Sequence, residues 1–195
     1  VELGRRRSSI RELFEYGKKR KAEIGGDKVF DFSIGNPSVP APAEVHSALK
    51  EIIEQTDPVI LHSYTSAQGD LSVRKTLADY INKRFGTSLT ADCLYMTCGA
   101  AASLTIVMNA LLNKDEEIIT VAPYFPEYKV FAEHAGGKLV AVDSADGTFQ
   151  LDLNRIEAAI NCRTKAVLIN SPNNPSGVVY NADDIKRLAQ LLERY

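Results

Sequence analysis

Two apolar runs limit the folds open to this chain more than any other feature of its sequence. Residues 118–121 read IITV and residues 166–169 read AVLI, and both runs are followed by turn-forming residues. Such runs are expected of strands covered on both faces, as parallel strands with helical crossovers are. Helical periodicity lies between the two runs, at residues 127–135 and 153–160. The sequence therefore predicts an α/β fold with a mostly parallel sheet and helical crossovers.

The same reading places further elements along the chain. The predicted strands cover residues 94–97, 117–122, 138–143 and 164–170. The predicted helices cover residues 8–23, 44–55, 71–85, 101–112, 127–135 and 153–160. A last helix is expected to begin near Asn181, whose side chain can cap it with Asp184 in a capping-box-like position, and to continue to Tyr195. A mixed α+β domain is the alternative architecture.

The N-terminal region follows a different pattern. Residues 29–34 alternate like a short strand and run into residues 35–42, where three prolines predict a stiff, extended loop. Gly35, beside that loop, would let a main chain approach a ligand closely. A plain linker explains the same residues equally well.

Composition and charge argue against several classes of function. The net charge of −2 gives no reason to expect a nucleic acid or an anionic membrane as a partner. No apolar run approaches the ~18 residues of a membrane span, and the N-terminus does not read as a signal peptide. The three cysteines show no metal-ligand spacing and no paired framework. A reduced, cytoplasmic setting is therefore expected.

Ligands of open α/β sheets collect outside the carboxyl ends of the strands, so the segments that leave the strands are the places to look for a site. Residues 97–103 read TCGAAAS, and small residues there leave the first N–H groups of the next helix bare for an anion such as a phosphate. The same small residues also suit close helix–sheet packing. The pattern is neither a dinucleotide fingerprint nor a P-loop.

Two later segments carry an aromatic ring and an amide. Residues 122–128 read APYFPEY, so Phe125 lies between prolines and can present its face to a planar ring, although it can equally fill the core. Residues 170–177 read NSPNNPSG, where the Asn174 amide can both donate and accept hydrogen bonds. Both dipeptides Asn-Pro and Ser-Gly are ordinary in loops, but the whole string after an apolar strand is much rarer.

Taken together, these segments resemble a known family. The chain carries, in order, Gly-Asn-Pro, Tyr-x4-Gly, Gly-Ala-Ala-Ala, Pro-Tyr-Phe-x-x-Tyr and Ser-Pro-Asn-Asn-Pro-Ser-Gly. This collinear set resembles the class I/II aminotransferases, which are fold type I enzymes that use pyridoxal 5'-phosphate (PLP). The resemblance runs from about residue 8 to the end of the chain.

The resemblance implies roles for individual residues. Asn174 would bond the phenolic oxygen of PLP, Phe125 would stack on its pyridine ring, and the main-chain amides of Ala100 and Ala101 would hold its phosphate. Tyr64 would reach the phosphate held by the other subunit of a homodimer. The substrate's α-carboxylate would lie against Gly35.

The resemblance also implies a division of the chain. Residues 1–45 would be an N-terminal helix and extended loop, part of a small domain or dimer arm, and residues 46–195 an incomplete PLP-binding large domain. The family's Schiff-base lysine follows the turn at residues 170–177, so no catalytic residue is assigned here. Lys165, at the start of a strand, and Lys186, on the last helix, are expected to be solvated surface residues.

The predicted function is therefore that of the N-terminal half of an aminotransferase, which moves an amino group between an amino acid and a 2-oxo acid. The 195 residues alone are predicted to be inactive. A PLP-dependent lyase of the same fold and a non-catalytic binding or dimerisation module remain alternatives. A Rossmann-type oxidoreductase ranks lowest, because the glycine fingerprint is missing.

Overall fold

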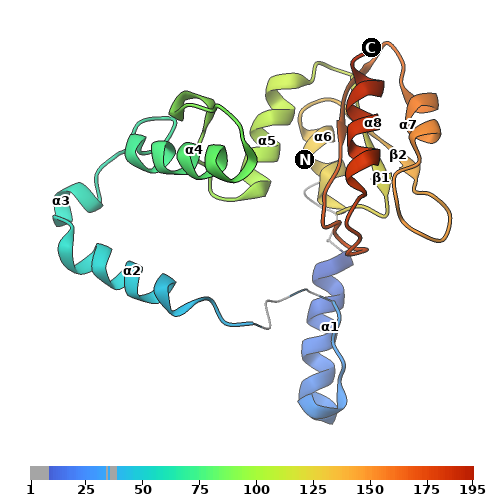
Figure 1. The fold of residues 1–195 in the computed structure, drawn as a ribbon. Helices are drawn as coiled ribbons and strands as arrows, with labels where there is room; N and C mark the ends of the chain where they lie inside the picture. Colours follow the sequence, from blue (N-terminus) through green and yellow to red (C-terminus); the bar gives the residue numbers. More distant parts are fainter. Residues whose placement is uncertain (1–8, 34, 36–38) are drawn as a thin grey trace. The chain divides into compact units, whose positions relative to one another are not determined.

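The computed structural model describes residues 9–33, 35 and 39–195 (Figure 1). The chain divides into two compact units, Val1–Tyr64 and Thr65–Tyr195. The boundary between residues 45 and 46 that the resemblance implies stays a prediction.

The regular elements in the described part of the first unit are all helices or 3-10 turns. Its elements are α1 (Ser9–Ile24), the 3-10 turn η2 (Gly26–Lys28), α2 (Ala43–Gln55) and α3 (Pro58–Leu61). The predicted helices at residues 8–23 and 44–55 are thus confirmed to within one residue at each end. The short helix α3 was not predicted, although Asp57 caps it by accepting from the amides of Val59 and Ile60.

The strand predicted at residues 29–34 is wrong over its described part, residues 29–33. The Asp31 carboxylate accepts a hydrogen bond from Lys21 Nζ at 2.8 Å and is bonded by both the amide and the hydroxyl of Ser33. These bonds hold the segment as a bend against α1, where Gly17 leaves room for the Asp31 side chain. The alternation of residues 29–34 suggested a strand, but a strand needs a neighbour to pair with. The described part of this unit contains no such strand.

The second unit is built on a parallel sheet of three strands in the order β2-β1-β3. These strands are β1 (Glu117–Ala122), β2 (Lys138–Asp143) and β3 (Thr164–Leu168), and β1 pairs in parallel with both neighbours. This confirms the α/β prediction and three of the four predicted strands. Because the strands are parallel, their carboxyl ends lie at one edge of the sheet.

Helices cover both faces of this sheet (Figure 1). The helices of the second unit are α4 (Leu71–Phe85), α5 (Ala100–Leu111), α6 (Glu127–His134), α7 (Leu153–Ala159) and α8 (Ala182–Leu192), with a 3-10 turn η3 (Ala91–Cys93). Val121 of β1 packs in a core cluster with residues of α7 and α8, whereas Ile118 packs with residues of α5 and α6. The central strand is therefore buried on both sides, as its apolar run predicts.

Three details of the second unit differ from the sequence-based expectations. Residues 94–97 are extended but form no strand, because no strand of the described sheet lies beside them; the amide of Met96 donates to Gln68 instead. The last helix ends at Leu192 rather than continuing to Tyr195. Asn181 is the N-cap residue of α8, but its side chain donates to Asp184 and makes no bond to the helix backbone.

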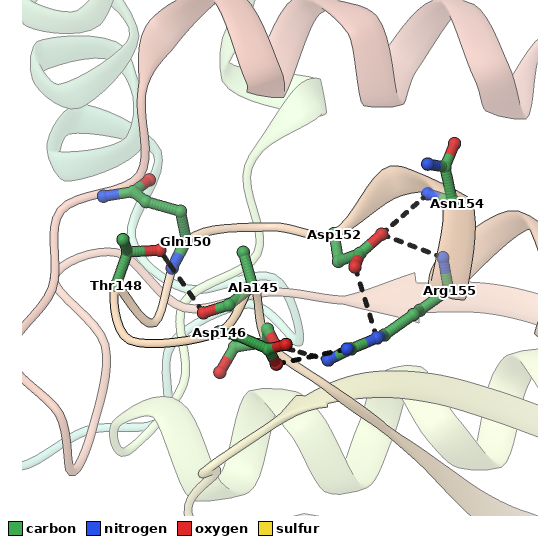
Figure 2. A network of polar contacts seen from close by, with 8 residues as sticks. Ala145, Asp146, Thr148, Gln150, Asp152, Asn154 and Arg155 are labelled. Atoms are coloured by element: carbon green, nitrogen blue, oxygen red, sulfur yellow. Dashed lines mark hydrogen bonds and ion pairs between the residues drawn. The ribbon is translucent and has the colours of Figure 1, made fainter.

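An ion-pair network fixes the loop that joins β2 to α7 (Figure 2). The Arg155 guanidinium donates to the carbonyl of Ser144 at 2.7 Å and pairs with Asp146 at 3.1 Å and Asp152 at 3.2 Å. Asp152 in turn caps α7 by accepting from the amides of Asn154 and Arg155. One side chain thus closes the loop of residues 144–152 on itself.

Candidate functional site

The carboxyl edge of the sheet brings together the segments that follow β1 and β3. The two strands are adjacent and pair up to Thr120 and Leu168. The chain leaves β1 after Ala122 toward Phe125, and it leaves β3 toward the turn that carries Asn174. Two of the predicted cofactor residues therefore follow neighbouring strand ends.

The N-terminus of α5 is open at the place predicted for a phosphate. Its N-cap, Gly99, has φ 93° and ψ 174°, a conformation that is essentially restricted to glycine. A hydroxyl pair between Thr97 and Ser103, 2.6 Å apart, ties the turn to the helix. Ala100 and Ala101 are exposed, and the first amides of an α-helix have no partner within the helix. The geometry is that of an anion site made of main-chain N–H groups.

Phe125 lies beside this edge with one side against another aromatic ring. It is half-buried, and its ring packs edge-on against Tyr128 with 5.6 Å between centroids. Tyr128 is buried, and burial raises the pKa of its hydroxyl, which stays neutral at physiological pH. Phe125 is thus held by packing rather than fully enclosed in the core.

The turn of residues 170–177 has an exposed asparagine and a buried one. Asn174 is exposed; its main-chain amide donates to the Asn170 side chain at 2.8 Å, and its own side chain makes no hydrogen bond to the residues described. Its neighbour Asn173 is only 7% exposed. The Asn173 side chain accepts from Ser176 and donates to the hydroxyl of Tyr180. The turn therefore exposes the side-chain amide of Asn174, while the hydrogen bonds of Asn173 hold the turn itself.

Sequence reasoning missed the part played by Asn173 and Tyr180. An asparagine followed three residues later by serine is a spacing at which the side chain can bond the backbone ahead of it. Tyr180 directly follows two valines at residues 178–179, which suggests that it is buried. A buried tyrosine hydroxyl needs a hydrogen-bond partner, so this is a further signal. Neither signal by itself gives the pairing of the two side chains.

Tyr64 and Gly35 belong to the first compact unit, and both are exposed there. Their roles toward the partner subunit's phosphate and the substrate carboxylate stay predictions. Asn36 and Pro37 of the same Gly-Asn-Pro motif lie outside the described residues.

Comparison with known proteins identifies the family to which this arrangement belongs. Residues 27–195 match the family model described as aminotransferase class I and II. The chain belongs to the class I and II aminotransferases. This confirms the family expected from the motifs, and the structural neighbours of the chain are fold type I aminotransferases.

Several individual aminotransferases are similar to the chain. A crystal structure of an aminotransferase from Eubacterium rectale is 55% identical with a TM-score of 0.94, covering 99% of this chain and 49% of that one. The aspartate aminotransferase structure from Rhizobium meliloti is 29% identical with a TM-score of 0.86, covering 97% and 46% of the two chains. The aspartate aminotransferase of Thermotoga maritima is 31% identical and covers 95% of this chain and 48% of its own. This aminotransferase chain thus spans about half the length of its relatives.

The two candidate lysines are both exposed and lie near acidic side chains. Lys165 is exposed near the start of β3 and pairs with Glu116 at 3.0 Å, while Lys186 is exposed on α8 and lies 4.0 Å from Asp183. Both positions agree with the expectation of solvated surface residues.

The described residues also form a surface pocket outside the predicted site. A polar surface pocket between α7 and α8 contains none of the predicted site residues; it is lined by Leu153, Asn154, Glu157, Arg187, Gln190, Leu191 and Arg194. Within residues 9–33, 35 and 39–195, no group of three or more potential metal ligands is present. None of the helices in that part of the chain is both long and apolar enough to cross a membrane.

Proposed function

We propose that this chain is the N-terminal half of a PLP-dependent aminotransferase that moves an amino group between an amino acid and a 2-oxo acid. Family membership and the names of relatives at 28–33% identity support the reaction class. Several of those relatives are aspartate aminotransferases, so aspartate is the first amino donor to test.

The observation that supports this proposal is that three exposed or half-buried groups of the second unit complement different parts of PLP. The open amides at Ala100 and Ala101 suit the phosphate of PLP, because N–H groups and the helix dipole favour an anion. The half-buried ring of Phe125 suits the flat pyridine ring. The free side-chain amide of Asn174 suits the phenolic oxygen, to which it would donate.

Bound PLP supplies an aldehyde that captures amino groups and a ring that withdraws electrons from the captured group. The residues of this chain would bind and orient it. Asn174 would hold the phenolic oxygen as an anion, and the first turn of α5 would hold the phosphate. Phe125 would lie against the face of the ring and limit its tilt.

The remaining parts of the proposal concern the rest of the enzyme. The Schiff-base lysine would follow residue 195 in the complete protein, so residues 1–195 alone would not transfer amino groups. A homodimer would bring Tyr64 to the phosphate of the other subunit, and Gly35 would lie against the substrate carboxylate. Residues 1–45 would belong to a small domain or dimer arm, and the enzyme would be cytoplasmic.

The test uses the complete protein that contains this chain. It is incubated with PLP, aspartate and a 2-oxo acid, and both the absorbance of bound PLP and the new amino acid are measured. Stoichiometric PLP and an amino group on the acceptor are expected. Release of ammonia in the absence of a 2-oxo acid acceptor would show that the reaction is that of a lyase and not a transferase. A protein that takes up no PLP would overturn the proposal.

A further inference from the structure

A buried pair of polar side chains lies beneath the turn that carries Asn174. Asn173 is 7% exposed and Tyr180 is 4% exposed, and Asn173 Nδ2 donates to the Tyr180 hydroxyl at 3.3 Å. The ring of Tyr180 belongs to the core cluster formed with α7 and α8. A tyrosine anchored in the core therefore presents its hydroxyl to the loop at the carboxyl edge.

Asn173 uses all of its hydrogen-bonding groups within this short segment. Its main-chain amide donates to the carbonyl of Val178 at 2.8 Å, and its carbonyl accepts from the amide of Gly177 at 2.7 Å. Its side-chain oxygen accepts from the amide of Ser176 at 3.2 Å and from the Ser176 hydroxyl at 2.9 Å. Of the bonds that the Asn173 side chain makes, only the one to Tyr180 connects it to a member of the core cluster.

The position of Tyr180 is itself fixed, both by Gln150 from outside the turn and by Ser171 within it. The Gln150 side chain donates to the carbonyl of Val179 and accepts from the amide of Asn181, both at 3.1 Å, so it holds the main chain on each side of Tyr180. The amide of Tyr180 donates to the Ser171 hydroxyl at 3.1 Å. Figure 2 shows the Gln150 side chain directed away from the Arg155 ion pairs that close its own loop.

We propose that Tyr180 is a positioning residue for the cofactor amide: through Asn173 it holds the turn in the shape that presents Asn174 at the carboxyl edge. Tyr180 does not touch the cofactor in this scheme, and Gln150 supports it from the β2–α7 loop. Burial raises the pKa of Tyr180, the Asn173 amide opposes that rise, and the nearby Tyr128 phenol adds to it. The hydroxyl therefore stays neutral at physiological pH and accepts the Asn173 bond without a buried charge.

The inference rests on the proposed function only in the identity of the group that Asn174 binds. The Tyr180→Phe variant keeps the buried ring and removes one oxygen, which leaves Asn173 Nδ2 without its partner. Without this bond the turn can leave the shape that presents Asn174, so in the complete protein the dissociation constant of PLP should rise by up to the ~5- to 30-fold that corresponds to one buried hydrogen bond. The control Tyr195→Phe removes an exposed hydroxyl that also donates over 3.3 Å, to Glu157, and should change binding less than ~2-fold.

A double-mutant cycle separates positioning from general destabilisation. If Tyr180 acts through Asn174, then Tyr180→Phe should weaken PLP binding by less than ~2-fold when Asn174 is already alanine. An equal weakening in both backgrounds would overturn the inference. Gln150→Ala is the second variant, for use if Tyr180→Phe does not fold. It leaves the core intact, and its effect on PLP binding should depend on Asn174 in the same way.

Amide hydrogen exchange gives a readout that needs no cofactor. The Gly177 amide is bonded to Asn173 within the turn and the Asn173 amide to the adjoining Val178, and Tyr180→Phe should speed the exchange of both by ~10-fold relative to amides of β1. Unchanged exchange at both amides would overturn the inference. Faster exchange in a protein that binds no PLP would instead reject the proposed function and leave the positioning of the turn in place.

Discussion

The hydroxyl of Thr120 donates to the main-chain carbonyl of Leu168 across 3.0 Å, joining the last paired residues of β1 and β3. Thr120 is almost fully buried, at 2% exposure. The bond lies immediately before the points at which the chain leaves the two strands for Phe125 and Asn174. The Thr120 side chain therefore links the two strands shortly before the segments that carry Phe125 and Asn174.

Replacing Thr120 with valine keeps the branched shape and removes this bond. We expect the free energy of unfolding to fall by about 1–2 kcal/mol, because the buried methyl that replaces the hydroxyl leaves part of the Leu168 carbonyl unpaired. Thr76→Val is the matched control: Thr76 lies exposed on α4 and donates to Ser72 within its own helix. Thermal unfolding of both variants measures the difference, and an equally small effect in the two would contradict the role assigned to the Thr120 bond.

Replacing Gly99 with alanine should affect both folding and the predicted phosphate site. The added Cβ would meet no heavy atom within 4 Å, so the penalty comes from the backbone, whose φ of 93° an alanine rarely adopts. A loss of about 1–3 kcal/mol in stability and weaker PLP binding are expected.

Gly26→Ala is the control for the Gly99 substitution. It also has open space around an added Cβ, but no left-handed φ. Its effect on stability should stay within about 0.5 kcal/mol. Urea unfolding and a PLP titration check both variants, and a Gly99→Ala protein as stable as wild type would show that the turn relaxes without strain.

Most elements of the second unit could be predicted from the sequence because local pattern and tertiary environment agree there. The strand at residues 117–122 contains the run IITV and is buried on both faces, so its composition carries the information. The helix α4 has the bounds that the periodicity of residues 71–85 predicts. Asp70 caps its first turn and Gly86 caps its end. Family resemblance then added an expectation that periodicity cannot give, namely that the ligand is PLP.

The sequence could not reveal features that depend on a distant neighbour. Residues 94–97 have the composition of a short strand, but a strand needs a hydrogen-bonding partner, and none lies beside them in the described sheet. The bond between Asn173 and Tyr180 depends on how the chain folds back after the turn. Gln150, thirty positions before Tyr180, has no local pattern at all that points to its two bonds with residues 179 and 181.

Replacing Asn174 with alanine tests the most specific predicted contact. In the complete protein we expect PLP binding to weaken by about 1–3 kcal/mol and activity to fall, since a polar partner of the cofactor is left unpaired. Stability should be nearly unchanged, because the side chain is exposed and bonds no described residue. Asn154→Ala, an exposed asparagine on α7, is the control. Equal PLP affinity and kinetics in the two variants would reject the role of Asn174.

The last prediction concerns stability at acid pH. Glu117 is buried at the start of β1, where its carboxylate accepts from Asn161 and from Arg163, each at 2.8 Å. These two bonds hold the pKa of Glu117 below its ordinary value of 4.5. A carboxylate with a lowered pKa in the folded state stabilises the fold fully above its unfolded value, and that contribution is lost as the pH falls through the folded pKa.

The Glu117→Gln variant lacks this charge, so it should melt below the wild type at about pH 7, and the gap between the two should narrow as the pH falls below about 4.5. Melting temperatures recorded between about pH 3 and pH 7 check the prediction. A gap that stays constant over this range would mean that packing, not charge, explains the difference. Because Glu117 lies at the amino end of β1, opposite the edge that carries Asn174, PLP affinity at about pH 7 should be the same in both proteins.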